Sequence, residues 1–146
     1  IKFRKKEGKE ICVDLKKKVQ IIEKNIQEIK KLDSKRIEKK KRKIHNEMDK
    51  LNLLIDKNRM EQEMIYYIEK FDINEEITRL NSHLKLFKSE FNNKLPVGKK
   101  LGFISQEIGR EINTLGAKAN DSQIQKIVIE MKDNLEKIKE NVLNIL

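Results

Sequence analysis

Aliphatic residues recur at steps of three and four along most of this 146-residue chain. That spacing places them on one side of an α-helix, so each stretch predicts a helix that packs lengthwise on a partner. The first series is Cys12, Leu15, Val19, Ile22, Ile26 and Ile29, and the most regular series is Ile124, Val128, Met131, Leu135, Ile138, Val142 and Ile145. With one Pro, five Gly and 5% aromatic residues, the composition suits long helices better than a sheet. We therefore expect an all-α, elongated fold.

Residues 1–57 are expected to form a basic helical hairpin arm. The first aliphatic series ends at Leu32, and Asp33-Ser34 offers a turn and a helix N-cap. A second series follows, which comprises Ile37, Ile44, Met48, Leu51 and Ile55. Two such helices joined by a short polar turn make a long antiparallel hairpin, whose tip should lie near residues 30–36.

Residues 58–146 are expected to form a C-terminal helical domain with coiled-coil-like packing. One helix should end at Phe71, and Asp72 to Glu75 resembles a capping box for the next helix. A loop around Pro96 precedes a helix that should begin at Gly98 and end at Gly116. The last helix should begin at residues 120–122, and its regular seam favours packing against long helices, including those of another subunit.

The chain carries 34 Lys and Arg against 24 Asp and Glu, which leaves a formal net charge of +10. Such an excess attracts polyanions, of which nucleic acid is the commonest. The densest part is the run Lys39, Lys40, Lys41, Arg42 and Lys43. A run of this kind is often a solvated helix face. Here the density of uncompensated charge favours an arm that contacts phosphates.

Cys12 is the single cysteine, which excludes an intramolecular disulfide framework and fits a reducing cytoplasm. It lies in the apolar register of the first helix, so a packed thiol is expected. No apolar run approaches the ~18 residues of a membrane span. These features predict a soluble cytoplasmic protein without a membrane partner. The chain begins at Ile1 inside a polar helical pattern, which suggests that it is part of a longer protein.

A first polar cluster has residue types that suit chemistry. Asp72, Glu76, Arg79 and His83 are spaced by four, three and four residues, so they share one helix face, with Glu75 beside them. A capped helix with one salt bridge and an exposed histidine is the simpler interpretation. The alternative is a carboxylate–imidazole cluster that holds a divalent ion or moves a proton.

The helix after Gly98 carries a second polar cluster. Glu107 and Glu111 lie one turn apart and face the same way, with Thr114 below them. Two carboxylates at that spacing repel each other unless a cation, an arginine or a shared proton lies between them, and Arg110 reaches only partly around the helix. The sequence contains no HExxH, CxxC or P-loop pattern that would fix the chemistry.

Three motifs carry a resemblance to a known family. They are EQE at 61–63, DINEEITRLNSHL at 72–84 and VGKKLGFISQEIGREINTLGAK at 97–118. Together with the last regular helix they resemble the C-terminal half of the YicC/YloC family of bacterial proteins. The resemblance implies a divalent-cation-dependent endoribonuclease that assembles as a ring-like hexamer in the bacterial cytoplasm, with a helical region that clamps RNA. Two departures are Gly102, where the family usually has Asp, and Ala117, where Ser is usual.

The leading hypothesis is metal-assisted cleavage of single-stranded or structured RNA. The predicted ligands of Mn²⁺ or Mg²⁺ are Asp72, Glu75, Glu76, Glu107 and Glu111. The predicted catalytic residues are His83, Glu107, Glu111, Arg79 and Arg110. The predicted RNA-binding residues are the run from Lys39 to Lys43 together with Arg59, Lys99, Lys100 and Lys118. The alternatives are a non-catalytic RNA-binding or oligomerisation module of a larger protein, and a purely structural coiled-coil module.

Overall fold

The computed structural model describes residues 3–51, 57–91 and 98–144, and every element in those ranges is an α-helix. The helices are α1 (Phe3–Leu51), α2 (Lys57–Phe71), α3 (Asn74–Phe91), α4 (Gly98–Ala119) and α5 (Ser122–Leu143). The all-α prediction is therefore confirmed. The predicted loop around Pro96 and the seam residues Ile55 and Ile145 lie outside the described residues.

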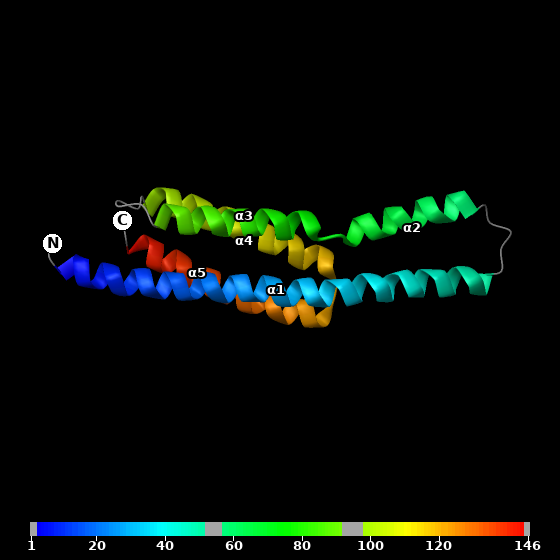
Figure 1. Ribbon diagram of the computed structural model, residues 1–146, viewed down its shortest axis with the longest axis horizontal. Coiled ribbons are helices and arrows are strands. Elements are labelled where there is room, and N and C mark those ends of the chain that lie inside the picture. Colours follow the sequence, from blue (N-terminus) through cyan, green and yellow to red (C-terminus); the bar gives the residue numbers. More distant parts are fainter. Residues whose placement is uncertain (1–2, 52–56, 92–97, 145–146) are drawn as a thin grey trace.

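The molecule is a long rod, and α1 runs along its length (Figure 1). Around the N-terminal half of α1, helices α3, α4 and α5 form a bundle, in which α3 packs on α4, α4 on α5, and α5 on α1. Beyond the bundle, the C-terminal half of α1 pairs with α2 alone to form a two-helix arm.

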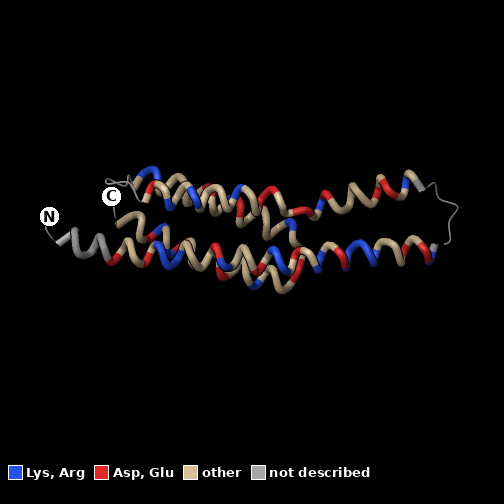
Figure 2. The backbone as a smooth tube through the Cα atoms, viewed as in Figure 1, with Lys and Arg blue, Asp and Glu red and all other residues tan. Residues whose placement is uncertain are grey.

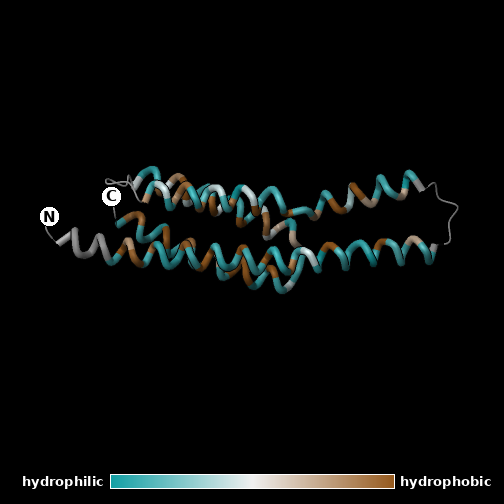
Figure 3. The backbone as a smooth tube through the Cα atoms, viewed as in Figure 1, coloured by the Kyte–Doolittle hydropathy of each residue, from teal (hydrophilic) through white to brown (hydrophobic). Residues whose placement is uncertain are grey.

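The core is built from the predicted aliphatic seams, which appear as apolar bands along the helices in Figure 3. The side chains of Leu15, Ile22, Leu80, Ile108 and Ile138 are all fully buried. Burying such a side chain stabilises the fold by about 1.5–3 kcal/mol, which makes these seams the main source of stability. Cys12 packs at the edge of this core, as its position in the apolar register predicts.

The predicted turn at Asp33-Ser34 is wrong, because α1 continues through it without a break. Asp33 does not cap a new helix. It accepts hydrogen bonds from Arg36, three residues later in the same helix, at 2.9 and 2.7 Å. The hydroxyl of Ser34 donates to the carbonyl of Lys30 at 3.4 Å. Both polar side chains are thus used inside the helix, so the hairpin forms between α1 and α2 instead of within residues 1–57. The domain boundary at residue 57 stays a prediction.

Gly116 does not end its helix, as the sequence had suggested. Helix α4 continues to Ala119, and Asn120 follows in the left-handed conformation at φ 42°. Gly116 instead permits close packing, since a Cβ there would lie 3.1 Å from Cγ1 of Val128 on α5. The predicted start of α5 is confirmed, because Asp121 Oδ1 accepts from the backbone N–H groups of residues 123 and 124 at 2.9 and 3.0 Å.

Candidate functional site

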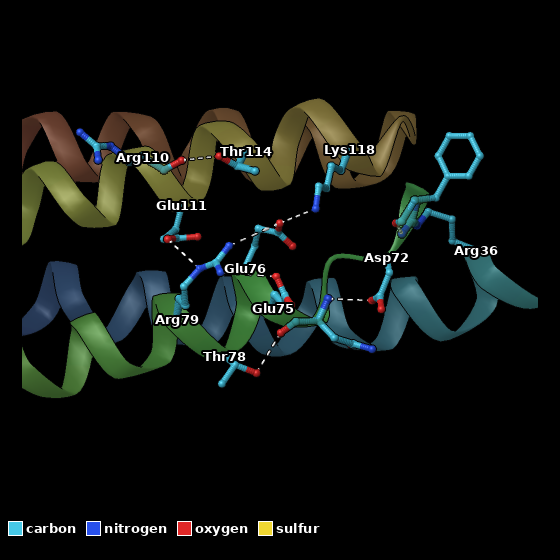
Figure 4. Close-up of polar contacts among 12 residues, drawn as sticks. Arg36, Asp72, Glu75, Glu76, Thr78, Arg79, Arg110, Glu111, Thr114 and Lys118 are labelled. Carbon is cyan, nitrogen blue, oxygen red and sulfur yellow. Dashed lines mark hydrogen bonds and ion pairs between the residues drawn. The ribbon is translucent and has the colours of Figure 1, made fainter. Parts of the chain in front are cut away.

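The two predicted polar clusters meet along one side of the antiparallel pair α3 and α4 (Figure 4). Three ion pairs join the helices, namely Glu76 to Lys118, Arg79 to Glu111 and Glu90 to Lys100. Each of these residues comes directly before a buried apolar residue in the sequence. On each helix, the residues that directly precede buried apolar residues form a row. In an antiparallel pair of helices, the two rows lie at the same edge of the apolar seam. The sequence pattern had placed each row on its helix, and the helix pairing brings the rows together.

Arg79 is at the centre of the site. Its Nε donates to Oε1 of Glu111 at 2.9 Å, and its guanidinium also pairs with Glu75 at 3.4 Å and Glu76 at 3.7 Å. The pKa of Arg79 is raised above its usual value, mainly because of the hydrogen bond with Glu111. The side chain is 48% exposed, so the guanidinium is held by carboxylates and still faces solvent.

Glu76 is the most deeply buried charge of the site, with 1% of its surface exposed. Its Oε1 accepts from the ammonium of Lys118 at 2.7 Å. The other oxygens of Glu76 and Glu111, both named Oε2, are buried without a hydrogen-bond partner. A buried acceptor without a partner costs about 1–3 kcal/mol, so the fold maintains these two carboxylates at some expense in stability.

The remaining predicted acids are more dispersed. Glu107 pairs with Arg110 at 3.7 Å within α4. Asp72 accepts from the backbone N–H of Asn74 at 2.9 Å, so it is engaged in the turn that leads into α3. His83 is half-buried, one turn beyond Arg79 on the same side of α3. The two glutamates of α4 therefore each have their own arginine partner, instead of sharing a cation between them.

A divalent cation finds a partial fit among these residues. Carboxylate oxygens are the ligands that Mg²⁺ and Mn²⁺ prefer, and the two buried Oε2 atoms are suited to that role. Within the described residues, however, no group of three or more His, Cys, Asp or Glu side chains is arranged to hold a metal ion. Glu76 and Glu111 could thus supply two ligands, and the complete predicted set of five stays a prediction.

The predicted RNA-binding residues fall into two places. Lys100 pairs with Glu90 at 3.5 Å, and Lys118 belongs to the site just described. The run from Lys39 to Lys43 and Arg59 lie on the arm. One member of the run is engaged within the fold, because the ammonium of Lys40 lies 3.2 Å from the centre of the Phe71 ring. Partial burial lowers the pKa of Lys40.

Sequence reasoning missed two exposed apolar residues on this side of α3 and α4. Leu86 follows Arg79 by seven residues, and Phe103 precedes Glu107 by four, so each continues the row of polar site residues along its helix. Both are more than half exposed. Their positions outside the aliphatic seams were the available signal. No helix in the described part of the chain is long and apolar enough to cross a membrane.

Comparison with known proteins agrees with the motifs at this site. Residues 29–146 match the family described as "Endoribonuclease YicC-like, C-terminal". A probable endoribonuclease YicC of Clostridioides difficile is 36% identical over 146 residues, which cover 98% of this chain and 50% of that protein. A probable endoribonuclease YicC of Haemophilus influenzae is 37% identical over 93 residues, which cover 64% of this chain and 32% of that protein. The chain thus spans half or less of the length of these relatives, and it belongs to the YicC-like family.

Proposed function

We propose that this chain is the helical part of an endoribonuclease, and that the paired side of α3 and α4 binds the RNA backbone at the position of cleavage. Support comes from the family to which it belongs and from the relatives that are named probable endoribonucleases. The observation that carries the proposal is the arrangement of charge around Arg79. The buried carboxylates of Glu76 and Glu111 pair with Lys118 and Arg79, and these two cations remain exposed to solvent.

This arrangement suits an anionic ligand. Glu76 and Glu111 are 1% and 10% exposed at their side chains, whereas Arg79 and Lys118 are 48% and 37% exposed. A phosphate that approaches from solvent therefore meets the two cations first. The carboxylates fix the direction of the guanidinium and the ammonium, so little reorganisation is needed when the phosphate binds.

Cleavage of a phosphodiester also needs proton transfer. His83 and Glu107 each lie one turn from the Arg79–Glu111 pair, at the same end of it, and both are partly exposed to solvent, so we assign them the general acid and base roles. Arg79 would stabilise the charge on the phosphorane, and Arg110 would hold a neighbouring phosphate. The nucleophile would be water or the 2′-hydroxyl of the RNA.

Divalent-cation dependence is part of the proposal. Glu76 and Glu111 would hold Mn²⁺ or Mg²⁺ through their unpartnered oxygens, with the other predicted acids Asp72, Glu75 and Glu107 close by in sequence. The bound ion would supply Lewis-acid stabilisation of the phosphate charge. We further propose a cytoplasmic homo-oligomer, a hexamer by family resemblance, in which several copies of this helical part clamp one RNA.

The test is cleavage of end-labelled RNA by the purified chain with Mn²⁺ or Mg²⁺, and with chelator. We expect Glu111→Gln and Glu76→Gln to slow cleavage by roughly 10²-fold, because isosteric amides keep the packing and remove the charge. The matched control is Glu136→Gln on α5, an exposed glutamate paired with Lys139 at 3.5 Å. Denaturant unfolding of each variant separates loss of chemistry from loss of fold.

Two outcomes would contradict the catalytic assignment. Glu111→Gln and Glu76→Gln could cleave as fast as the Glu136→Gln control, which would exclude these carboxylates from the reaction. Alternatively, the chain could bind RNA in a salt-sensitive manner and leave it intact under every metal condition. That result would favour the non-catalytic RNA-binding module, for which the complete pairing of the site's cations with carboxylates is the supporting observation.

A further inference from the structure

The two-helix arm is less well packed than the bundle. Its seam consists of side chains that are all partly exposed where they are described: Ile37, Lys40, Ile44 and Met48 from α1, and Met60, Met64, Ile68 and Phe71 from α2. Lys40 belongs to this seam because its ammonium lies 3.2 Å from the centre of the Phe71 ring, and Leu51 continues the α1 series in the sequence. No residue of α1 after Arg36, and none of α2, is fully buried where side chains are described. The arm therefore presents two long sides to solvent, one at each edge of this seam.

The pairing of α3 and α4 shows how to assign residues to those two sides. Every ion pair between these helices joins residues that come directly before seam residues. Helices α1 and α2 are also consecutive in the chain, and they pair in opposite directions (Figure 1). The same register rule therefore applies, because it depends on the helical period and the antiparallel direction alone. Residues before the arm's seam residues share one side, and residues after them share the other.

The first side of the arm is basic. On α1 its members are Lys39, Lys43, Glu47 and Lys50, and on α2 they are Arg59, Glu63, Tyr67 and Lys70. All eight are exposed. Five cations thus stand against two anions. We call this set the basic side of the arm.

The second side of the arm is acidic. On α1 its members are Glu38, Lys41, His45 and Asp49, and on α2 they are Glu61, Ile65 and Glu69. Here one lysine stands against four carboxylates. Figure 2 shows lysine and arginine mixed with aspartate and glutamate along both helices of the arm, and the register separates these charges into two sides.

We propose that the basic side of the arm is a binding surface for single-stranded RNA, an inference that rests on the proposed function. Lys39 and Lys43 are separated by about 6 Å along the helix axis, since four residues rise about 6 Å, and Lys50 lies about 10 Å beyond Lys43. A row of that kind can follow successive phosphates of an extended strand. Counterion release from those phosphates provides the affinity.

Tyr67 is the reason why we assign single-stranded RNA, and not a duplex, to this surface. It lies within the basic row of α2, between Glu63 and Lys70, and 45% of its surface is exposed. A base that is free of its duplex partner stacks on such a ring, whereas a paired base cannot reach it. Tyr66 is the comparison, because it is 65% exposed one position before Tyr67, and its ring meets the Tyr67 ring edge-on with the centroids 6.1 Å apart.

The basic run from Lys39 to Lys43 is divided between the two sides of the arm. Lys39 and Lys43 belong to the basic side, and Lys41 belongs to the acidic side. Arg42 faces outward, where it lies 3.9 Å from Glu38 in an exposed ion pair. A dense run of five cations therefore supplies only part of its charge to the proposed surface.

The experiment compares two double charge reversals in the full chain, Lys39→Glu/Lys43→Glu and Lys41→Glu/Arg42→Glu. Both change the net charge by the same amount, within the same five residues, and all four side chains are exposed. Binding of a fluorescent single-stranded RNA is measured by anisotropy over a range of salt concentrations. We expect the first variant to bind at least tenfold more weakly. Its salt slope should fall by roughly 1.4, since each lost phosphate contact contributes about 0.7.

The control variant should bind within about twofold of the parent chain. Tyr67→Leu should lose about fivefold in affinity for the single strand and nothing for a duplex, while Tyr66→Leu, which removes only the edge contact with the Tyr67 ring, should have a clearly smaller effect on the single strand. Circular dichroism melting confirms that each variant is folded.

The possible failures can be told apart. Equal weakening by both charge reversals would show that net charge alone matters, and would overturn the assignment of a side. If Lys39→Glu/Lys43→Glu binds RNA normally while Glu111→Gln still slows cleavage, the basic side is wrong and the proposed function stands. If the same reversal changes the oligomeric state by light scattering and leaves RNA affinity intact, the basic side binds the acidic side of another copy. Absence of RNA binding by the parent chain at low salt would overturn both proposals.

Discussion

Arg36 is buried to 5% exposure although it lies at the start of the most basic stretch of the chain. Its guanidinium pairs with Asp33 and donates to the carbonyl of Ala119 at 2.8 Å and to the carbonyl of Phe71. These carbonyls end α4 and α2, where helix carbonyls lack partners and the helix dipole is negative. One side chain of α1 therefore holds the ends of two other helices.

This contact predicts a large effect of Arg36→Met on stability. The substitution leaves Asp33 buried without its cation, so the free energy of unfolding should fall by about 3–5 kcal/mol. Urea unfolding provides the measurement. The matched control is Lys35→Met at the exposed neighbouring position, which should stay within about 0.5 kcal/mol of the parent chain. A similar effect at both positions would contradict the role assigned to Arg36.

The sequence predicts residues of this kind unevenly. Core positions such as Ile22 and Leu80 follow from the apolar period, because that period fixes which helix face is buried. Arg36 could not be recognised in this way, since its partners come from helices that end 35 and 83 residues later in the chain. The pairing of Arg79 with Glu111 has the same origin, 32 residues apart. Local spacing placed both side chains on a helix face and could not identify the facing helix.

At the scale of the element, helix ends were predicted where a side chain caps the backbone and were wrong where tertiary contacts decide. Asp121 is such a local signal and was recognised. Asp72 accepts from the backbone N–H of Asn74, but the expected capping box is wrong, because the carboxylate of Glu75 pairs with Arg79 instead. Asp33-Ser34 carries the same residue types as a cap, yet the helix continues because Arg36 binds Asp33 within it. Gly116 looked like a terminator, and its small size instead serves the contact with α5.

The two glycines of α4 therefore predict different responses to alanine. Apart from its chain neighbours and the backbone of its own helix, nothing lies within 4 Å of a Cβ at Gly102, so Gly102→Ala should raise the free energy of unfolding by about 0.5–1 kcal/mol through helix propensity. At Gly116 the new methyl group would lie 3.1 Å from Val128, and crowding should cancel that gain or reverse it. Thermal and urea unfolding of both variants measure the difference. Equal stabilisation at the two positions would show that Gly116 has no packing role.

At the scale of the whole molecule, the chain divides into a well-packed bundle and an arm that shares α1 with it (Figure 1). The bundle contains all of the fully buried apolar residues of the described chain. The candidate site lies on the bundle, where α3 and α4 are held firmly by their seam, whereas the proposed RNA surface lies on the arm. A rigid cleavage site beside a more compliant binding arm would let the arm adjust to the course of a strand.

Amide hydrogen exchange should reveal this division directly. Local stability depends on buried apolar contacts, and the arm's seam residues, such as Ile44, Met48 and Met64, are all partly exposed. Amides at 41–50 and 58–70 should therefore exchange through local opening, with protection several-fold to many-fold below that of 15–32, 77–90 and 101–118. The latter segments should exchange only at the global free energy of unfolding.

Single-stranded RNA should raise protection in the arm if it binds the basic side, and this increase should vanish in Lys39→Glu/Lys43→Glu. Uniform protection along α1, from the bundle to the arm, would show that α1 unfolds as one cooperative unit.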